Sequence, residues 1–404
     1  MNTADPNKYM KVYELLAQTP MIHFQHSQTG ATLRPSEVKP KLDRFLRKIK
    51  GSIPEDWSVS GQCDSNQQAA LNYKMRIIRT GERETVNIND CKLYFGNTGS
   101  EDPKDLVFAD CKLEIICFIP ELMKQIDENI GAFFVLHNFG TRQSKGFGGF
   151  LVKGFHSQRQ IEAIVKKHFP HYFYADFVCN EDVVARLDHA MVVYTCMKNG
   201  FSMGKKAFDG YAASCFLPSE IGTDKEYIKY CIIKGEKEGY DTYEFIRAVF
   251  GLAENYDYRR EGIVKVLQFD GTYISDKGIV VPADSIRNNA GIKRFQSPVQ
   301  IKIFKDRMYF LFTENYRDIL NKVFILMKDH DWKQVEALIK QNRIDEAQRR
   351  LQSAHFIATP NAVDIAFFAK DFVDYYNEER HILRGFPKKW KPSAGLILQK
   401  GGQN

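Results

Sequence analysis

The chain has 404 residues, of which 44% are hydrophobic and 26% are charged; this is the composition of a globular protein and excludes a disordered one. No apolar run approaches the roughly 18 residues that a membrane-spanning helix requires, and Met1–Gln18 is too polar for a signal or transit peptide, so a cytoplasmic location is expected. The net charge of +7 is compatible with a polyanionic partner but does not require one.

The first 155 residues predict a domain with the element order strand, helix, strand, strand, helix, strand. Strand patterns are found at residues 21–25, 69–80, 92–95, 106–108, 113–119, 132–136 and 150–152. Apolar residues at helical spacing (Val38, Leu42, Phe45, Leu46 and Ile49) predict a helix between Pro35 and Gly51, and a second helix is predicted at residues 120–130. This order, with an insertion after the first helix, indicates an α+β, ferredoxin-like (RRM-like) fold.

A second unit is expected from about residue 156. Its strand-like runs lie at residues 190–196, 227–233, 264–269, 299–304 and 308–312. Beyond His330 the apolar spacing becomes helical, and the Lys-, Gly- and Pro-rich residues 387–404 predict a loose tail. The expected domains are residues 1–155, 156–330 and 331–404.

The first predicted helix is unusually basic. Its cations are Arg34, Lys39, Lys41, Arg44, Arg47, Lys48 and Lys50, against only Glu37 and Asp43. One interpretation is a solvated helix face, and the other is a surface that follows the phosphates of a nucleic acid. The helix alone does not decide between them.

A glycine-rich turn spans residues 137–150. Gly140, Gly146, Gly148 and Gly149 allow close backbone approach, so the turn is predicted to form an anion-binding nest of amides. Arg142 and Lys145 supply charge, and Phe147 offers a ring on which a base stacks. The turn is neither a Walker A loop nor a Rossmann turn, because Lys145 precedes Gly146 and no helix follows. The alternative is a tight hairpin turn that is incidentally basic.

The remaining polar residues indicate neither a metal nor a cofactor, and none is expected. The eight cysteines form no C-x-x-C pair and are predicted to be buried, reduced thiols. The acids Asp209, Glu220, Asp224 and Glu226 lack ligand spacing and are expected in solvated loops.

Four segments together resemble the RAMP superfamily of type III CRISPR effector subunits, most closely the capping subunit of the Cmr complex. Residues 33–47 resemble its helix motif at Leu33, Arg34, Pro35, Lys39, Leu42 and Arg47, and depart from it at Pro40 and Asp43. Residues 139–149 are similar to its glycine loop, and residues 94–96 and 106–113 are similar to the segments between. Residues 246–251 and 294–301 resemble a second, degenerate copy.

The resemblance implies two ferredoxin-like RAMP domains, the second degenerate, with a helical C-terminal region. It also implies that the basic helix and the glycine loop face one another and hold single-stranded guide or target RNA without reading its sequence. The implied RNA-binding residues are Arg34, Lys39, Arg44, Arg47, Arg142, Lys145, Gly146, Phe147 and Gly148. The implied partners are guide RNA, target RNA and other RAMP or Cas subunits, with no membrane. Four phosphate contacts would give a slope of log affinity against log salt of roughly −3.

A non-catalytic protein is favoured, because the loop at residues 26–32 lacks the acid of target-cutting relatives. The main alternative is a metal-independent endoribonuclease that processes guide RNA with His23, His26 or His137. A third possibility is an assembly subunit of a RAMP-containing defence complex, CRISPR or not, whose basic surface contacts acidic protein.

Overall fold

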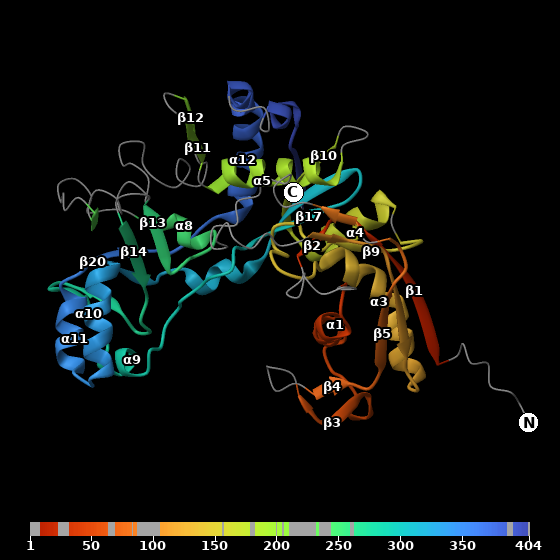
Figure 1. Ribbon diagram of the computed structural model, residues 1–404, viewed down its shortest axis with the longest axis horizontal. Helices are drawn as coiled ribbons and strands as arrows, with labels where there is room; N and C mark the ends of the chain where they lie inside the picture. Colours follow the sequence, from red (N-terminus) through yellow and green to blue (C-terminus); the bar gives the residue numbers. More distant parts are fainter. Residues whose placement is uncertain are drawn as a thin grey trace, which may run out of the picture. The chain divides into compact units, whose positions relative to one another are not determined.

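The computed structural model describes residues 9–22, 32–63, 69–82, 84–86, 106–155, 157–177, 182–198, 200–203, 206–209, 232–233, 244–258, 262–385 and 391–402. The chain forms two compact units (Figure 1). Unit 1 contains Met1–Val192, Gln300–Leu311 and Pro387–Asn404, and unit 2 contains Val193–Val299 and Phe312–Phe386. Helices and small antiparallel sheets are mixed throughout, which confirms the predicted α+β class.

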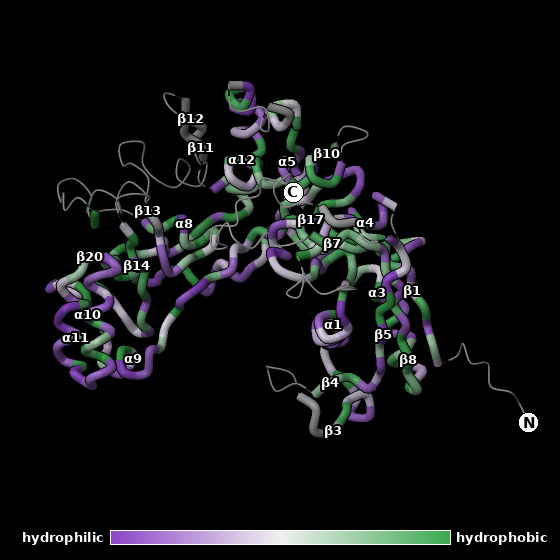
Figure 2. The backbone as a smooth tube through the Cα atoms, in the orientation of Figure 1, coloured by the Kyte–Doolittle hydropathy of each residue, from purple (hydrophilic) through white to green (hydrophobic). Residues whose placement is uncertain are grey.

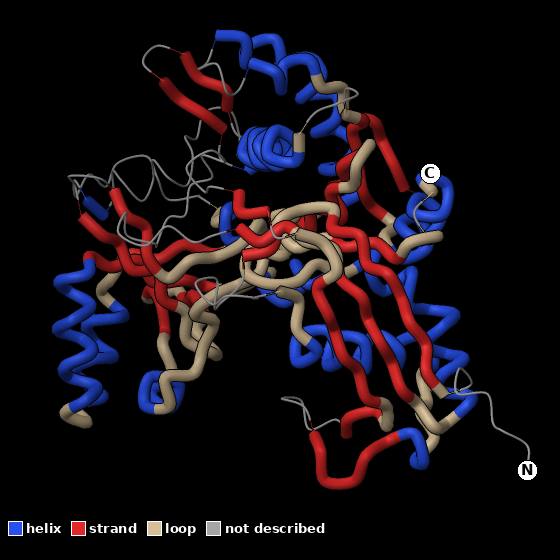
Figure 3. Tube along the Cα trace, turned by 45° about the vertical axis from the view of Figure 1, so that its right-hand side comes forward, coloured by secondary structure: helices blue, strands red, loops and turns tan. Residues whose placement is uncertain are grey.

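The first sheet of unit 1 has the strand order β5-β8-β1-β9. Its members are β1 (Met10–Ala17), β5 (Lys74–Arg79), β8 (Cys111–Ile116) and β9 (Phe150–Val152), and each neighbouring pair is antiparallel. In chain order, α1 (Pro35–Lys50) lies between β1 and β5, and α3 (Pro120–Leu136) lies between β8 and β9. Figure 3 shows the long strands of this sheet in red, running side by side.

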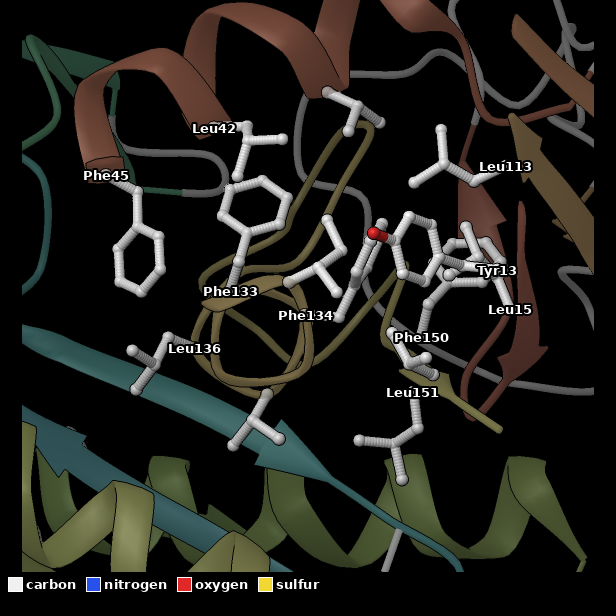
Figure 4. Packing of buried hydrophobic residues seen from close by; sticks show 14 of the residues in the cluster. Tyr13, Leu15, Leu42, Phe45, Leu113, Phe133, Phe134, Leu136, Phe150 and Leu151 are labelled. Carbon is white, nitrogen blue, oxygen red and sulfur yellow. The ribbon is translucent and has the colours of Figure 1, made fainter. Parts of the chain in front are cut away.

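One face of this sheet forms the main core of unit 1 with α1 and α3. Tyr13 and Leu15 of β1 alternate with more exposed residues, so both point to the same face. They belong to one cluster of buried side chains with Phe45 of α1 and with Phe133 and Phe134 of α3 (Figure 4). The two helices are therefore held to the sheet by burial of apolar surface.

A second four-stranded sheet repeats the order of the first. Its strands β10 (His171–Asp176), β17 (Val299–Ile303), β18 (Arg307–Phe312) and β21 (Gln399–Gly402) lie in the order β17-β18-β10-β21. As in the first sheet, this is the second, third, first and fourth strand of the set in chain order. Along the chain, α5 (Val183–Lys198) follows β10, and α12 (Ile365–Glu379) precedes β21.

Unit 2 contains a sheet with the order β13-β14-β19-β20. The strands are β13 (Asn255–Tyr258), β14 (Gly262–Leu267), β19 (Val323–Lys328) and β20 (His355–Ala358). Helices α9 (Ala283–Arg287), α10 (Asp329–Lys340) and α11 (Ile344–Gln352) contribute Ile286, Val335 and Leu351 to its core. Figure 2 shows hydrophilic residues, in purple, recurring along α10 and α11, as expected for helices with one buried face.

The shorter elements connect these layers. They are β2 (Met21–Ile22), β3 (Ser58–Cys63), β4 (Ala69–Leu71), β6 (Glu84–Val86), β7 (Leu106–Phe108), α4 (Gln158–His168), β11 (Gly200–Met203), β12 (Lys206–Asp209), α8 (Ile246–Val249), β15 (Tyr273–Ser275), β16 (Gly278–Val280) and the 3-10 turns Glu55–Trp57, Glu314–Ile319, Arg380–Gly385 and Lys391–Gly395.

Several sequence predictions are corrected. Residues 132–136, predicted as a strand, end α3, and residues 190–196, also predicted as a strand, lie in α5. Both runs are almost entirely apolar, so they show no periodicity that separates helix from strand. The predicted loose tail contains β21, which pairs with β10. The predictions at residues 23–25, 92–95 and 227–231 lie outside the described residues.

Three further predictions concern chemistry and location. Cys111, Cys117 and Cys196 are buried free thiols, as predicted for them. Within the described ranges, no three His, Cys, Asp or Glu side chains gather as a metal ion requires. None of the described helices is long and apolar enough to cross a membrane.

Candidate nucleic-acid interface

Helix α1 forms as its sequence predicts. Pro35 stands in its first turn, where a missing amide costs nothing, and Gly51 ends it with a φ of +78°. The predicted apolar stripe is buried except for Ile49, which is 40% exposed at the last turn. Of the predicted RNA-binding residues on this helix, Arg44 is exposed, while Lys39 and Arg47 are half-buried.

Asp43, the acid that departs from the family motif, is a buried acceptor. The Tyr73 hydroxyl donates to Asp43 Oδ1 at 2.6 Å, and the Leu71 amide donates to Oδ2 at 3.1 Å. The Lys39 Nζ lies 3.1 Å from the same oxygen and donates to the Leu71 carbonyl at 2.8 Å. Burial, assisted by the Asp43 charge, raises the pKa of Tyr73, so the phenol remains a donor. Asp43 therefore anchors α1 to the segment between β4 and β5.

Replacing Asp43 with alanine is expected to lower the free energy of unfolding by about 3 kcal/mol, because the Tyr73 hydroxyl and the Leu71 amide lose their acceptor while buried. Urea unfolding followed by circular dichroism measures this loss. Asp56→Ala is the control, because Asp56 is exposed. Equal midpoints for the two variants would contradict the anchoring role.

Arg47 also makes internal contacts. Its Nη2 donates to the Ser58 hydroxyl at 3.3 Å and to the Ala69 carbonyl. Lys50 lies over the Trp57 ring, 4.9 Å from the ring centroid. The basic helix thus divides into cations that hold neighbouring segments and cations, such as Arg44, that face solvent.

The glycine loop, residues 138–149, is closed by hydrogen bonds within the loop and to residues 19 and 20. The amides of Gly146, Gly148 and Gly149 donate to the Gln143 carbonyl, the Pro20 carbonyl and the Thr19 hydroxyl at 3.3, 2.9 and 2.8 Å. The Thr19 hydroxyl in turn donates to the Gly146 carbonyl at 2.7 Å. Because these amides already have protein acceptors, they do not form the predicted anion nest in this conformation. Side chains, not amides, are the groups that this loop offers to a phosphate.

The glycines are required by conformation and close approach. Gly140 and Gly148 have φ values of +80° and +70°, in the left-handed region that favours glycine. A Cβ on Gly148 would lie 1.9 Å from the Phe139 carbonyl oxygen, and one on Gly140 would lie 2.7 Å from the Ile22 carbonyl oxygen. Both positions therefore exclude any side chain.

The basic helix and the glycine loop are in direct contact. The Gly140 amide donates to Glu37 Oε1 at 2.7 Å. The Lys41 Nζ donates to the Asn138 carbonyl at 2.8 Å and to Gln143 Oε1 at 2.5 Å. The two segments that the sequence singled out thus form one surface, named here the helix–loop surface: α1 together with residues 138–149.

A buried lysine is hydrogen-bonded to the first residues of the loop segment. Lys302 of β17 is 0% exposed, and its Nζ donates to the His137 carbonyl at 2.9 Å and to Asn138 Oδ1 at 2.5 Å. Burial, together with the Lys41 charge, lowers the pKa of Lys302 well below its usual value. Its Nζ lies at the carboxyl end of α3, where free carbonyl groups accept hydrogen bonds. The Asn138 Nδ2 donates to the carbonyls of Gln143 and Ile301 at 2.7 and 3.0 Å. Lys302 and Asn138 therefore fix both the helix end and the loop.

The two loop cations are partly buried and close together. Arg142 has a φ of +59°, a backbone conformation that residues other than glycine rarely adopt. Burial, together with the Arg142 charge, lowers the pKa of Lys145 to about 7. Phe147 is 0% exposed, so it packs inside the loop in this conformation. A stacking role for its ring would require the loop to open.

The histidine alternatives are only partly visible. His23 and His26 lie outside the described residues. His137 stacks on Phe133 with ring centroids 4.7 Å apart, and its Nδ1 lies 2.9 Å from the Phe133 carbonyl oxygen. Burial, together with the Lys302, Lys41 and Arg44 charges, lowers the pKa of His137 to about 4. A neutral, weakly basic imidazole of this kind is poorly matched to general acid–base catalysis near neutral pH.

Sequence reasoning did not assign roles to Thr19, Glu37, Lys41, Asn138 or Lys302. The only available signal was the position of Glu37 and Lys41, one turn apart on the basic helix. Lys302 alternates with apolar residues in its strand and therefore resembles a solvent-facing residue, but this strand is buried on both faces.

Comparison with known families gives two matches that together span most of the chain. The model of the Cmr1 N-terminal domain matches residues 9–201, and that of the Cmr1 C-terminal domain matches residues 210–389. No curated protein matches the chain. Among solved structures, the chain is similar to the crystal structure of Cmr1 from Pyrococcus furiosus (apo form), with 9% identity, a TM-score of 0.37 and coverage of 87% of this chain and 99% of that one. It is also similar to a chain in the cryo-EM structure of the type III-B Cmr-beta bound to cognate target RNA, with 12% identity, a TM-score of 0.23 and coverage of 36% and 60%.

Proposed function

The chain belongs to the Cmr1 family, and from that premise we propose that it is an RNA-binding subunit of a type III CRISPR (RAMP) ribonucleoprotein effector. It holds guide or target single-stranded RNA without reading its sequence and without cleaving it. The observation that carries this proposal is the helix–loop surface, in which two basic segments distant in sequence are hydrogen-bonded together.

The proposed RNA contacts fall into two groups. Arg34, Arg44, Arg142 and Lys145 contact phosphates directly. Lys39 and Arg47, whose nitrogen atoms donate to protein oxygens, add positive potential and hold the neighbouring hairpin. The glycines and Phe147 shape the loop, because Gly146, Gly148 and Phe147 are buried. RNA affinity then comes mainly from phosphate neutralisation and depends strongly on salt.

We also propose that the first two four-stranded sheets, β5-β8-β1-β9 and β17-β18-β10-β21, are each the core of a ferredoxin-like domain. What supports this is the strand order, second-third-first-fourth, with a helix after the first strand and another before the fourth. The expected boundary at residue 155 precedes α4, whereas the one at residue 330 falls within α10. The strands of the second sheet extend to residue 402, so the proposed second domain resumes after an inserted sheet.

The proposed partners are guide RNA, target RNA and other RAMP or Cas subunits. The family membership supports a place among such subunits. The competing assembly role is tested by purification: an assembly subunit keeps its partner proteins after nuclease treatment, whereas the proposed subunit loses those held through RNA. Cleavage of labelled RNA on a gel by the purified protein would instead support the endoribonuclease alternative.

RNA binding is expected to weaken as pH rises above about 7. Lys145 in the free protein is neutral above its pKa of about 7, and a phosphate beside it raises that pKa. Binding therefore takes up a proton above this pH, and affinity falls by up to about tenfold per pH unit until the pKa of the bound state is reached. Fluorescence anisotropy at fixed salt between about pH 6 and about pH 9 measures the effect.

Lys145→Arg is the matched variant for this pH series, because arginine stays protonated throughout. It is expected to bind RNA with little change over the same range. A wild-type protein whose affinity is flat across the series would contradict phosphate contact by Lys145.

A further inference from the structure

A small cavity opens beside the root of the glycine loop. It has a volume of about 180 Å³ and lies wholly within unit 1. Gln18 lines the cavity, and its backbone amide donates to the Gly149 carbonyl at 2.8 Å. The cavity therefore begins where the glycine loop ends. Leu151, two residues beyond Gly149, forms another part of the wall.

The walls of the cavity are mostly apolar, with an aromatic side. Leu16, Leu151 and Ile161 supply aliphatic surface. Phe304 and Tyr309 supply two rings in edge contact, with centroids 6.0 Å apart. A cavity of about 150 Å³ accommodates a single benzene ring, so this one suits one planar ring system and is too small for a drug-sized molecule.

Tyr309 contributes a buried polar group. It is 1% exposed, and among the described residues its hydroxyl has no hydrogen-bond partner of good geometry. Burial raises the pKa of Tyr309 to about 12. Arg307 acts in the opposite direction, first through its side-chain interaction with the hydroxyl and then through its charge, but the hydroxyl keeps its proton and can donate. A buried, unsatisfied hydroxyl is costly unless a ligand uses it.

The charge of the cavity favours a neutral ligand. Arg307 is its most buried cation, but Asp176 holds the guanidinium at 2.6 and 3.1 Å and Glu162 holds it at 3.3 Å. The Gln158 amide oxygen accepts from the same group, 2.6 Å from Nη2. The guanidinium is therefore already compensated by carboxylates. Lys305 and Asp306, both exposed, also line the cavity and carry opposite charges.

We propose that this cavity takes one unstacked nucleobase, lying between Phe304 and the aliphatic wall and hydrogen-bonded by Gln18 and Tyr309. Apolar walls with a few amide and hydroxyl groups are the chemistry that recognises a splayed base. The proposal deepens the RNA-holding role and rests on it, because the bound RNA is the molecule that supplies the base. An RNA strand whose backbone follows the glycine loop places a base in this cavity.

The first test uses free nucleosides, so that it does not depend on RNA binding. Saturation-transfer NMR on the full chain is expected to detect at least one of the four nucleosides binding in the millimolar range. Leu16→Trp fills the cavity and is expected to abolish this signal. Val12→Trp is the matched control, because Val12 lies on the same strand and the same sheet face but outside the cavity and is 43% exposed. No nucleoside signal, or equal signals from both variants, would overturn the proposal.

A second variant guards against misfolding. Tyr309→Phe removes only the unsatisfied hydroxyl, so Tm is expected to stay the same or rise while nucleoside affinity falls by about fivefold. Tyr13→Phe, which breaks a 2.9 Å hydrogen bond to Asp127, is expected to lower Tm without changing nucleoside binding. Tyrosinamide binding in place of any nucleoside would assign the cavity to a partner protein's side chain and overturn the proposal.

The third measurement separates this proposal from the proposed function. Single abasic substitutions along a bound RNA are expected to weaken binding at one position by about 5- to 150-fold, the range of base stacking. Tight RNA binding with a flat abasic profile would overturn the base site and leave the RNA-binding role intact. Nucleoside binding without any RNA binding would support the base site and contradict the RNA-binding role.

Discussion

A protein with Arg142 and Lys145 both changed to alanine is expected to bind single-stranded RNA about 100-fold more weakly at low salt. The two cations lie on the same loop, and the Arg142 charge lowers the pKa of Lys145, so they act on one region of the RNA backbone. Each phosphate contact on a single strand contributes about 0.7 to the salt slope. The slope is therefore expected to fall from about −3 to about −1.5.

The control for this variant removes the same charge elsewhere. Lys333 and Lys340 of α10 lie in unit 2, and both side chains are 70% exposed. Changing both to alanine is expected to leave the salt slope unchanged within error. Equal losses of affinity in the two double variants would mean that net charge, not the helix–loop surface, determines binding. Fluorescence anisotropy over a potassium chloride series measures both, with circular dichroism to verify folding.

Gly148→Ala is expected to lower the free energy of unfolding by about 4 kcal/mol or more. The residue has a φ of +70°, and its new Cβ would lie 1.9 Å from a backbone oxygen of Phe139, which no side-chain movement relieves. The loop must shift, and the hydrogen bond from the Phe139 amide to the Gly148 carbonyl, 2.9 Å long, is lost with it. RNA binding is expected to fall as well, because the same loop carries Arg142 and Lys145.

Gly154→Ala is the matched control, because Gly154 also has a positive φ, +85°, but a Cβ there meets nothing within 4 Å. Its expected cost is about 1 kcal/mol, from the backbone conformation alone. Chemical denaturation of the two variants gives the comparison. If Gly148→Ala costs no more than Gly154→Ala, the loop is not closed as described.

The helix–loop surface was largely predictable, because its signals are local. Helix α1 has a clear 3.6-residue apolar period with a proline at its start and a glycine at its end, and the glycine loop carries four glycines within ten residues. The side chains that join the two were not predictable. Thr19 and Lys302 lie 127 and 164 residues from their loop partners Gly146 and Asn138, and no local pattern marks such contacts.

The second sheet was harder to predict for a topological reason. Strand β10 ends at Asp176 and its neighbour β18 begins at Arg307, with unit 2 elements in between. The four strands of this sheet are therefore far apart in the sequence, and no local pattern shows that they belong to one sheet. The final strand β21, Gln399–Gly402, has no apolar residue and forms through backbone pairing with β10 alone, so composition predicted a tail.

Buried runs produced the remaining errors. The end of α3 and residues 190–196 of α5 are almost entirely apolar, and an apolar run of five to seven residues fits a strand as well as a helix. Asp43 was identified from the sequence only as a departure from the family motif, and in the structure three donors surround it. A departure from the family motif thus became a structural anchor.

Binding of labelled single-stranded RNA to the wild-type protein across a salt series, with the same samples run on a gel, tests the central claim most directly. The expected result is tight binding at low salt, a slope of log affinity against log salt of about −3, and intact RNA. Failure to bind at low salt, or a slope near zero, would contradict the proposal that the helix–loop surface holds RNA, and cleaved RNA would contradict the non-catalytic role.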